Sequence, residues 1–256
     1  MHPEPPAQKP RRERHLVRWI FIGILSILGW YGWKAYDFRQ AVTEAEALGW
    51  RFDYEAFDTR IRKDWKNAFR KGTWADAHRW LLITKSDQLE SHFDVVHRLE
   101  PNHLEIAHSL HHGDLSGLKS LSSLSSLWLM DCPNLTSIDA LKDIKKLNHL
   151  LISSAPKLAN IDPIKELKDL QALELVDCKA LPNLDALRDL ATLKTLIVTN
   201  CTRLKNVDGI LGLEGLQKLD LYANGWLTKE TLTIVRSALP RTKINASYPR
   251  HWTQDE

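Results

Sequence analysis

Hydrophobic residues in the second half of the chain recur with a fixed period of 23 residues. Each repeat follows the pattern LxxLxLxxCxxLxxIDxLxxL, and six repeats stand in register between residues 101 and 238. The first leucine of the LxL triplet recurs at Leu104, Leu127, Leu150, Leu173, Leu196 and Leu219. One step further back, Leu81, Ile83 and Leu89 fit a degenerate capping repeat. The pattern predicts a solenoid, because one repeat cannot bury its own leucines and only stacked repeats can.

The spacing inside one repeat predicts its local structure. The LxL triplet has the period of two that is typical of a strand, so Leu127 and Leu129 should both point inward. Leu135, Ile138 and Leu141 then recur every third residue, which favours a tight 3₁₀-like segment over a long α-helix. One strand per turn, always in the same direction, predicts an α/β solenoid with a parallel sheet on its concave face.

A ladder of acidic residues accompanies the leucines. Asp139, Asp162, Asp185 and Asp208 are also 23 residues apart, and Pro163 follows one of them. We expect each aspartate to be the N-cap of a short convex segment. A calcium ladder is the less favoured alternative, because single carboxylates on separate turns make poor calcium cages.

These repeats resemble the leucine-rich-repeat family, and the resemblance covers more than half of the chain. The length of 23 and the IDxLxxL half are similar to bacterial repeats of the internalin kind. The position usually held by asparagine departs from the family pattern, since it holds Cys132, Ala155, Cys178, Cys201 and only then Asn224. The cysteines should be small buried residues, and a Cys178–Cys201 bridge remains open.

The N-terminal residues differ from the repeats. Four prolines and four arginines predict a disordered basic tail over residues 1–18, and residues 19–33 carry no charge. As a helix, that run of 15 residues spans about 22 Å, short of the ~30 Å hydrocarbon core, but Arg18, Lys34 and the flanking aromatic residues can extend it. A cleaved signal peptide and a buried helix are the alternatives. An uncleaved transmembrane signal anchor fits best, because no A-x-A cleavage pattern follows.

The charges around this run predict topology. The arginines before it place the N-terminus in the cytoplasm, so the repeat domain should be extracytoplasmic, or periplasmic in a bacterium. Residues 34–100 are expected to form a helical linker and N-terminal cap, with a helix over 35–48, a strand near 50–54 and an amphipathic helix through Phe57, Ile61 and Trp65. Residues 239–256 should form a C-terminal cap and tail, with a helix capped by Thr228 before them and a last strand at 243–245.

The composition argues against several classes of function. A net charge of +3 over 256 residues gives no strongly basic face, which argues against nucleic-acid binding. Three cysteines without a CxxC pair exclude a zinc ribbon and a disulfide scaffold. The chain has no GxGxxG, P-loop, GxSxG or HExxH motif, so we expect neither an enzyme nor a cofactor. The one histidine-rich region is expected to be solvated loop rather than a metal site: His92, His97, His103, His108, His111 and His112.

The outward strand positions carry the candidate functional residues. An apolar stripe crosses five turns where a solvent-facing surface would be polar, and such patches often mark interfaces. We expect the concave face to bind a protein partner through Trp128, Met130, Leu151, Glu174, Val176, Ile197, Thr199, Asp220 and Tyr222. Three alternatives remain open: the chain's own N-terminal region covers the stripe, the stripe is ordinary scatter of surface apolar residues, or the protein is a structural cell-envelope scaffold without regulated binding. A metal-dependent or other enzyme is a distant alternative.

Overall fold

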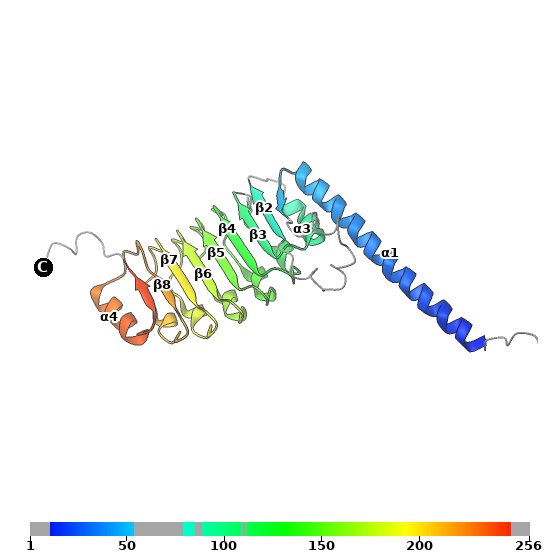
Figure 1. Ribbon diagram of the computed structural model, residues 1–256. Helices are drawn as coiled ribbons and strands as arrows, with labels where there is room; N and C mark the ends of the chain where they lie inside the picture. The colour runs from blue at the N-terminus through cyan, green and yellow to red at the C-terminus, as the bar shows by residue number, and fades with distance from the viewer. Residues whose placement is uncertain (1–10, 54–78, 85–88, 109, 111, 247–256) are drawn as a thin grey trace, which may run out of the picture.

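The computed structural model describes residues 11–53, 79–84, 89–108, 110 and 112–246. Figure 1 shows a long N-terminal helix that leads into an elongated array of strands, and a helix packed at the far end. The described residues contain one sheet of nine strands, ordered along the chain from β1 to β9.

The sheet is parallel over nearly its whole length. β1 (Arg51–Asp53) pairs antiparallel with β2 (Trp80–Thr84), and every later neighbour is parallel. Leu127 pairs with Leu150 and Leu150 with Leu173, so the register advances by 23 residues per strand. The predicted parallel sheet is confirmed, and it begins at β2, one strand before residue 101. The remaining strands are β3 (His103–Ala107), β4 (Ser126–Met130), β5 (His149–Ser153), β6 (Ala172–Val176), β7 (Thr195–Thr199), β8 (Lys218–Asp220) and β9 (Lys243–Asn245).

Short 3₁₀ helices line the convex side, as the three-residue spacing predicted. They are η2 (Ser116–Leu118), η3 (Asp139–Asp143), η4 (Asp162–Glu166), η5 (Asp185–Leu187) and η6 (Asp208–Ile210). The predicted role of the aspartates as N-caps is wrong. Asp139 is the first residue of its helix, and its N–H is accepted by the Ser137 hydroxyl at 3.1 Å. The Asn160 and Asn183 side chains do the same for Asp162 and Asp185.

The leucine ladder forms one continuous core. Leu127, Leu150, Leu173 and Leu196 are all 0% exposed, as are their partners two positions later in each strand. Full burial of such a side chain stabilises the fold by about 1.5–3 kcal/mol. Every turn of the solenoid contributes such side chains to the core. The cysteines belong to the same interior: Cys132, Cys178 and Cys201 are buried and unbridged.

A left-handed residue follows each strand from β3 to β8. The φ angle is between 52° and 56° at six positions spaced by 23: His108, Asp131, Ser154, Asp177, Asn200 and Ala223. Histidine, aspartate and asparagine tolerate this region better than most residues do, which suits them to the position. The N–H of such a residue can donate to the next strand, as from His108 to the Met130 carbonyl at 3.0 Å. These side chains form a row along one edge of the sheet.

The N-terminal end of the array is covered by helices. α1 (Arg11–Ala47) packs against α3 (Phe93–Leu99) and buries its Ala41 and Ala45. The 3₁₀ helix η1 (Leu89–Ser91) precedes α3. The predicted disordered tail is wrong from Arg11 onward, because the residues after Pro10 continue the helix without another proline. The expected helix through Phe57 lies outside the described residues, as do positions 1–10 and 247–256.

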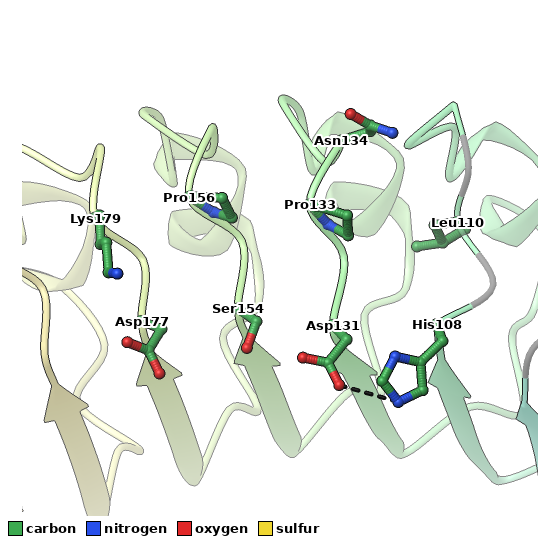
Figure 2. Close-up of a pocket in the computed structure, with 9 residues that line it drawn as sticks. All are labelled: His108, Leu110, Asp131, Pro133, Asn134, Ser154, Pro156, Asp177 and Lys179. Atoms are coloured by element: carbon green, nitrogen blue, oxygen red, sulfur yellow. Dashed lines mark ion pairs between the residues drawn. The ribbon is translucent and has the colours of Figure 1, made fainter.

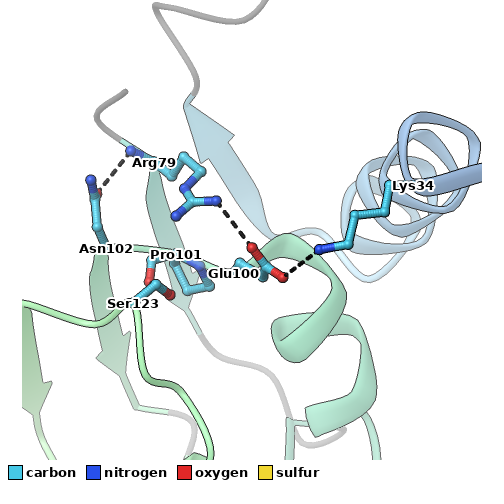
Figure 3. A network of polar contacts seen from close by, with 6 residues as sticks. All are labelled: Lys34, Arg79, Glu100, Pro101, Asn102 and Ser123. Carbon is cyan, nitrogen blue, oxygen red and sulfur yellow. Dashed lines mark hydrogen bonds and ion pairs between the residues drawn. The ribbon is translucent and has the colours of Figure 1, made fainter. Parts of the chain in front are cut away.

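Two polar networks join α1 to the solenoid. Arg98 of α3 contacts Asp37 and Glu44 of α1 and also Asp94 of its own helix. Figure 3 shows the second network, in which the Glu100 carboxylate lies between Lys34, at 3.5 Å, and Arg79, at 3.4 Å. The C-terminal half of α1 is therefore fixed to the first turns.

In the described part of the chain, no helix has both the length and the apolar character that a membrane span requires.

The C-terminal end follows the prediction closely. α4 (Lys229–Ala238) begins after Thr228, whose hydroxyl accepts the Thr231 N–H at 3.1 Å. Leu232 and Val235 of α4 are buried against the last turn. β9 then pairs with β8 in parallel and ends the sheet among the described residues.

Candidate functional site

The concave face consists of the first, third and fifth residues of each strand. In β4, Leu127 and Leu129 are completely buried, whereas Ser126, Trp128 and Met130 between them are half-buried. The same alternation holds in β5, β6 and β7. The structure places eight predicted partner-binding residues at such outward positions: Trp128, Met130, Leu151, Glu174, Val176, Ile197, Thr199 and Asp220. The ninth, Tyr222, follows β8 and is 54% exposed.

Four rings from adjacent strands pack together at the N-terminal end of this face. The ring centroids of Trp80 and His103 are 4.2 Å apart, and those of His103 and Trp128 are 4.8 Å apart. Trp128 also lies 5.9 Å from Trp80 and 5.8 Å from His149, both in edge-to-face geometry. We call Trp80, His103, Trp128 and His149 the aromatic cluster. Its rings come from β2, β3, β4 and β5, brought together by the sheet register.

The cluster creates an unusual environment for polar groups. Burial, and then the nearby His149, lowers the pKa of His103 from 6.5 to about 4. The His103 Nε2 and Trp128 Nε1 atoms are buried without a hydrogen-bond partner among the described residues. Burial raises the pKa of Glu105, and a hydrogen bond from Trp80 partly offsets that effect. His149 Nε2 lies 3.3 Å from the Glu174 carboxylate.

Three members of the aromatic cluster are not predicted as site residues from the sequence. Trp80 belongs to the predicted capping region. The prediction that His103 is a solvated loop histidine is wrong, because His103 begins β3 and is half-buried. His149 is not among the predicted site residues. The period of two could have found them, since the residue immediately before each LxL triplet must also face outward. The packing of the rings could not be inferred from the period.

A depression borders the concave face along the edge where the strands end. Its volume is about 520 Å³, and left-handed residues that follow β3 to β6 contribute to its lining. Figure 2 shows His108 and Asp131 side by side, with 3.1 Å between Nε2 and the carboxylate. Asp177 accepts a hydrogen bond from Asn200 of the next turn. The full lining is His108, Leu110, Asp131, Pro133, Asn134, Ser154, Pro156, Asp177 and Lys179.

Metal-ligating side chains do not gather in the described ranges: no three His, Cys, Asp or Glu residues there are arranged to hold an ion. His108 lines this depression, while His112 lies by Glu90 with 3.9 Å between Nε2 and the carboxylate. His111 lies outside the described residues.

Comparison with known proteins identifies the architecture. No family model and no curated protein matches the chain. Among solved structures, a leucine-rich-repeat protein of Leptospira interrogans matches 59% of this chain with a TM-score of 0.51 and 23% identity. Internalin C2 of Listeria monocytogenes matches 69% with a TM-score of 0.50 and 18% identity. The chain has a leucine-rich-repeat fold. It spans 38% of the Leptospira protein's length and 76% of the internalin's.

The leucine-rich-repeat fold accounts for the geometry of the site. Because each turn places its strand in register with the last, residues far apart in sequence form continuous rows on the concave face. Such rows can present side chains to a macromolecule over several turns, which is the way repeat solenoids bind. The rows here combine rings, aliphatic side chains and carboxylates.

Proposed function

We propose that this leucine-rich-repeat protein is anchored in a membrane and binds another protein through its concave face. The observation that carries the binding proposal is the aromatic cluster together with the apolar residues beside it. Trp80 is 43% exposed, and Trp128, Met130 and Leu151 remain only half-buried. Tryptophan and methionine are enriched at protein interfaces, where large, partly exposed apolar side chains become fully buried.

The anchor proposal rests on the N-terminal half of α1. The uncharged residues 19–33 lie within this single helix, whose first half extends away from the solenoid in Figure 1. Near the end of the run, Trp30 and Trp33 are 50% and 60% exposed, and the Lys34 ammonium lies 4.9 Å from the Trp30 ring. Aromatic residues and a snorkelling lysine are typical of a membrane–water interface. The arginines before the run support a cytoplasmic N-terminus and an extracytoplasmic solenoid.

Binding is tested with the double variant Trp128→Asp plus Ile197→Asp in the full chain. Cross-linking in the native membrane, followed by mass spectrometry, should recover a partner from the wild type and lose it from the variant. Ile234→Asp is the matched control, because Ile234 is 55% exposed on α4, away from the concave face. An unchanged partner set in the double variant would reject the concave face as the binding site.

The anchor and its orientation are tested separately. The full chain should resist extraction from membranes by alkaline carbonate and be released by detergent. A reporter enzyme that is active only outside the cytoplasm, fused after Glu256, should be active. Carbonate release would reject the anchor, and an inactive reporter on a membrane-bound chain would reject the orientation.

A structural envelope scaffold is the second candidate, and the two networks around Arg98 and Glu100 favour it. They join the C-terminal half of α1 to the first turns, as an element that transmits mechanical force would require. In that case the Trp128→Asp plus Ile197→Asp variant would keep the same cross-linked partners as the wild type. Arg98→Ala would instead alter the mechanical behaviour of the cell envelope. The two candidates are therefore distinguished by the same pair of variants.

A further inference from the structure

We infer that the partner presents a basic segment, with arginine or lysine side chains between apolar ones, to the concave face over β3 to β6. This inference rests on the proposed function and names the chemistry of its partner. It is argued from the charge of the surface, from the neighbours of each carboxylate and from the rings beside them.

The charge of this region is opposite to that of the whole chain. The outward strand positions of β3 to β6, with the left-handed residue after each strand, include four carboxylates and no lysine or arginine: Glu105, Asp131, Glu174 and Asp177. With histidine counted as neutral, the surface carries −4, while the chain carries +3. Lys179 is the one lysine or arginine among the nine residues that line the depression at the strand ends. Opposite charges favour encounter with a basic partner.

The carboxylates are not neutralised by the side chains that contact them. Asp131 and Glu174 lie next to the histidines His108 and His149. Asp177 accepts from the neutral amide of Asn200, and Glu105 from the indole of Trp80. A neutral histidine or an amide orients a carboxylate without cancelling its charge as a lysine or arginine would. These oxygens therefore remain available to a cation from outside.

The aromatic cluster supplies a second feature that favours a cation. Trp80 is partly exposed, and Trp128 sits between Glu105 and Leu151 in the paired row of third strand positions. An ammonium or guanidinium group can lie over an indole face while it pairs with an adjacent carboxylate. Leu151 and Val176 offer apolar contact for the residues between the cations. The pattern fits an extended polypeptide that crosses the strands.

The inference is tested by fluorescence anisotropy on the full chain in a non-ionic detergent. The probes are two labelled 12-residue peptides of alternating composition, one with arginine and leucine and one with glutamate and leucine. The arginine peptide should bind, and the glutamate peptide should bind at least tenfold more weakly. Raising salt from 50 to 300 mM should weaken the arginine peptide several-fold. Empty micelles measure the binding of each peptide to detergent.

A matched pair of double variants shows whether the arginine peptide binds to the concave face. Glu105→Gln plus Glu174→Gln should raise the Kd of the arginine peptide about tenfold. Asp139→Asn plus Asp162→Asn removes two exposed carboxylates from the convex side and should leave the Kd within twofold. Equal binding of both peptides, or equal Kd values for the two double variants, would overturn the inference.

The outcomes also separate this inference from the proposed function. If the native partner depends on Trp128 and Ile197 but neither peptide shows the charge effect, the concave face binds a protein of other chemistry and only the basic segment is refuted. If the partner set ignores Trp128 and Ile197, the proposed function itself fails. A second copy of this chain, seen as a concentration-dependent dimer lost in the Trp128 variant, would also refute the basic segment.

Discussion

Asn224 offers a quantitative test of what holds the last turns of the solenoid together. It occupies the inward position that holds cysteine in three earlier turns, and it is 1% exposed. Its amide donates to the Val198 carbonyl at 2.6 Å, and its oxygen accepts the Cys201 N–H at 2.9 Å. One side chain therefore satisfies two buried backbone groups of the preceding turn. The perturbations to compare are Asn224→Ala and Asn224→Cys.

The structure allows the cost of each change to be worked out. Alanine leaves the Val198 carbonyl and the Cys201 N–H without partners, at about 1–3 kcal/mol for each buried group. Cysteine should cost only about 1–2 kcal/mol, because its thiol can make weaker versions of both hydrogen bonds. Cys201 shows how: its sulfur lies 3.7 Å from the Leu175 carbonyl and accepts from the Cys178 N–H. We expect Asn224→Ala to lose about 2–6 kcal/mol in total, the sum for the two groups.

Thermal unfolding of the full chain, followed by tryptophan fluorescence in a non-ionic detergent, measures the difference. At roughly 2–4 °C per kcal/mol for a domain of this size, Asn224→Ala should melt about 4–24 °C below the wild type. Asn224→Cys should melt between the two. Ala155 fills the same position in an earlier turn and is also fully buried. If Asn224→Ala melts within 2 °C of the wild type, this position needs no hydrogen bond and the reasoning is refuted.

Three further predictions concern the core, the aromatic cluster and the cap. Leu173→Arg buries an unpaired charge at a 0% exposed position, so cooperative melting should be lost, and normal melting would contradict the register. His103 has its pKa lowered to about 4, so the unfolded chain takes up its proton first and stability falls as pH drops from 6.5 towards 4. Linkage gives about 3 kcal/mol, which solvent screening of this half-buried ring reduces to about 1–2 kcal/mol. His103→Gln should remove that part of the urea-unfolding pH profile, and identical profiles would contradict it. Arg98→Ala breaks contacts to Asp37 and Glu44, so α3 should exchange its amide hydrogens faster while β6 does not.

The period of the leucines was enough to predict the fold because burial and register express the same constraint. Leu150 and Leu173 are buried at equivalent positions, so their strands pair in parallel at a fixed offset. The outward residues Trp128 and Ile197 follow from the inward ones by the period of two. Thr228 was recognisable because N-capping depends on local sequence, and its hydroxyl does accept the Thr231 N–H.

Features that depend on backbone angles or on tertiary packing could not be predicted from the period of the leucines. The Asp139 position recurs every 23 residues just before a predicted convex segment, as an N-cap residue would, but an N-cap residue needs an extended backbone. The residue before η3, Ile138, has φ −118° and ψ 24°, so the acceptor comes from Ser137 instead. His103 looked solvated because sequence cannot show that Trp80 and Trp128 enclose it. The boundary at Arg11 depends on where helix propensity overcomes the preceding prolines.

The two halves of the proposed function are linked by a short path of residues. Lys34, at the end of the uncharged run, pairs with Glu100, and Glu100 pairs with Arg79, the residue before Trp80 of the aromatic cluster. Because α1 is one helix from Arg11 to Ala47, no flexible linker separates the proposed anchor from this path. An anchor at residues 19–33 would therefore hold the aromatic end of the concave face near the bilayer and leave β8 and β9 farther out. The geometry favours a partner whose basic segment lies close to the extracytoplasmic surface of the membrane.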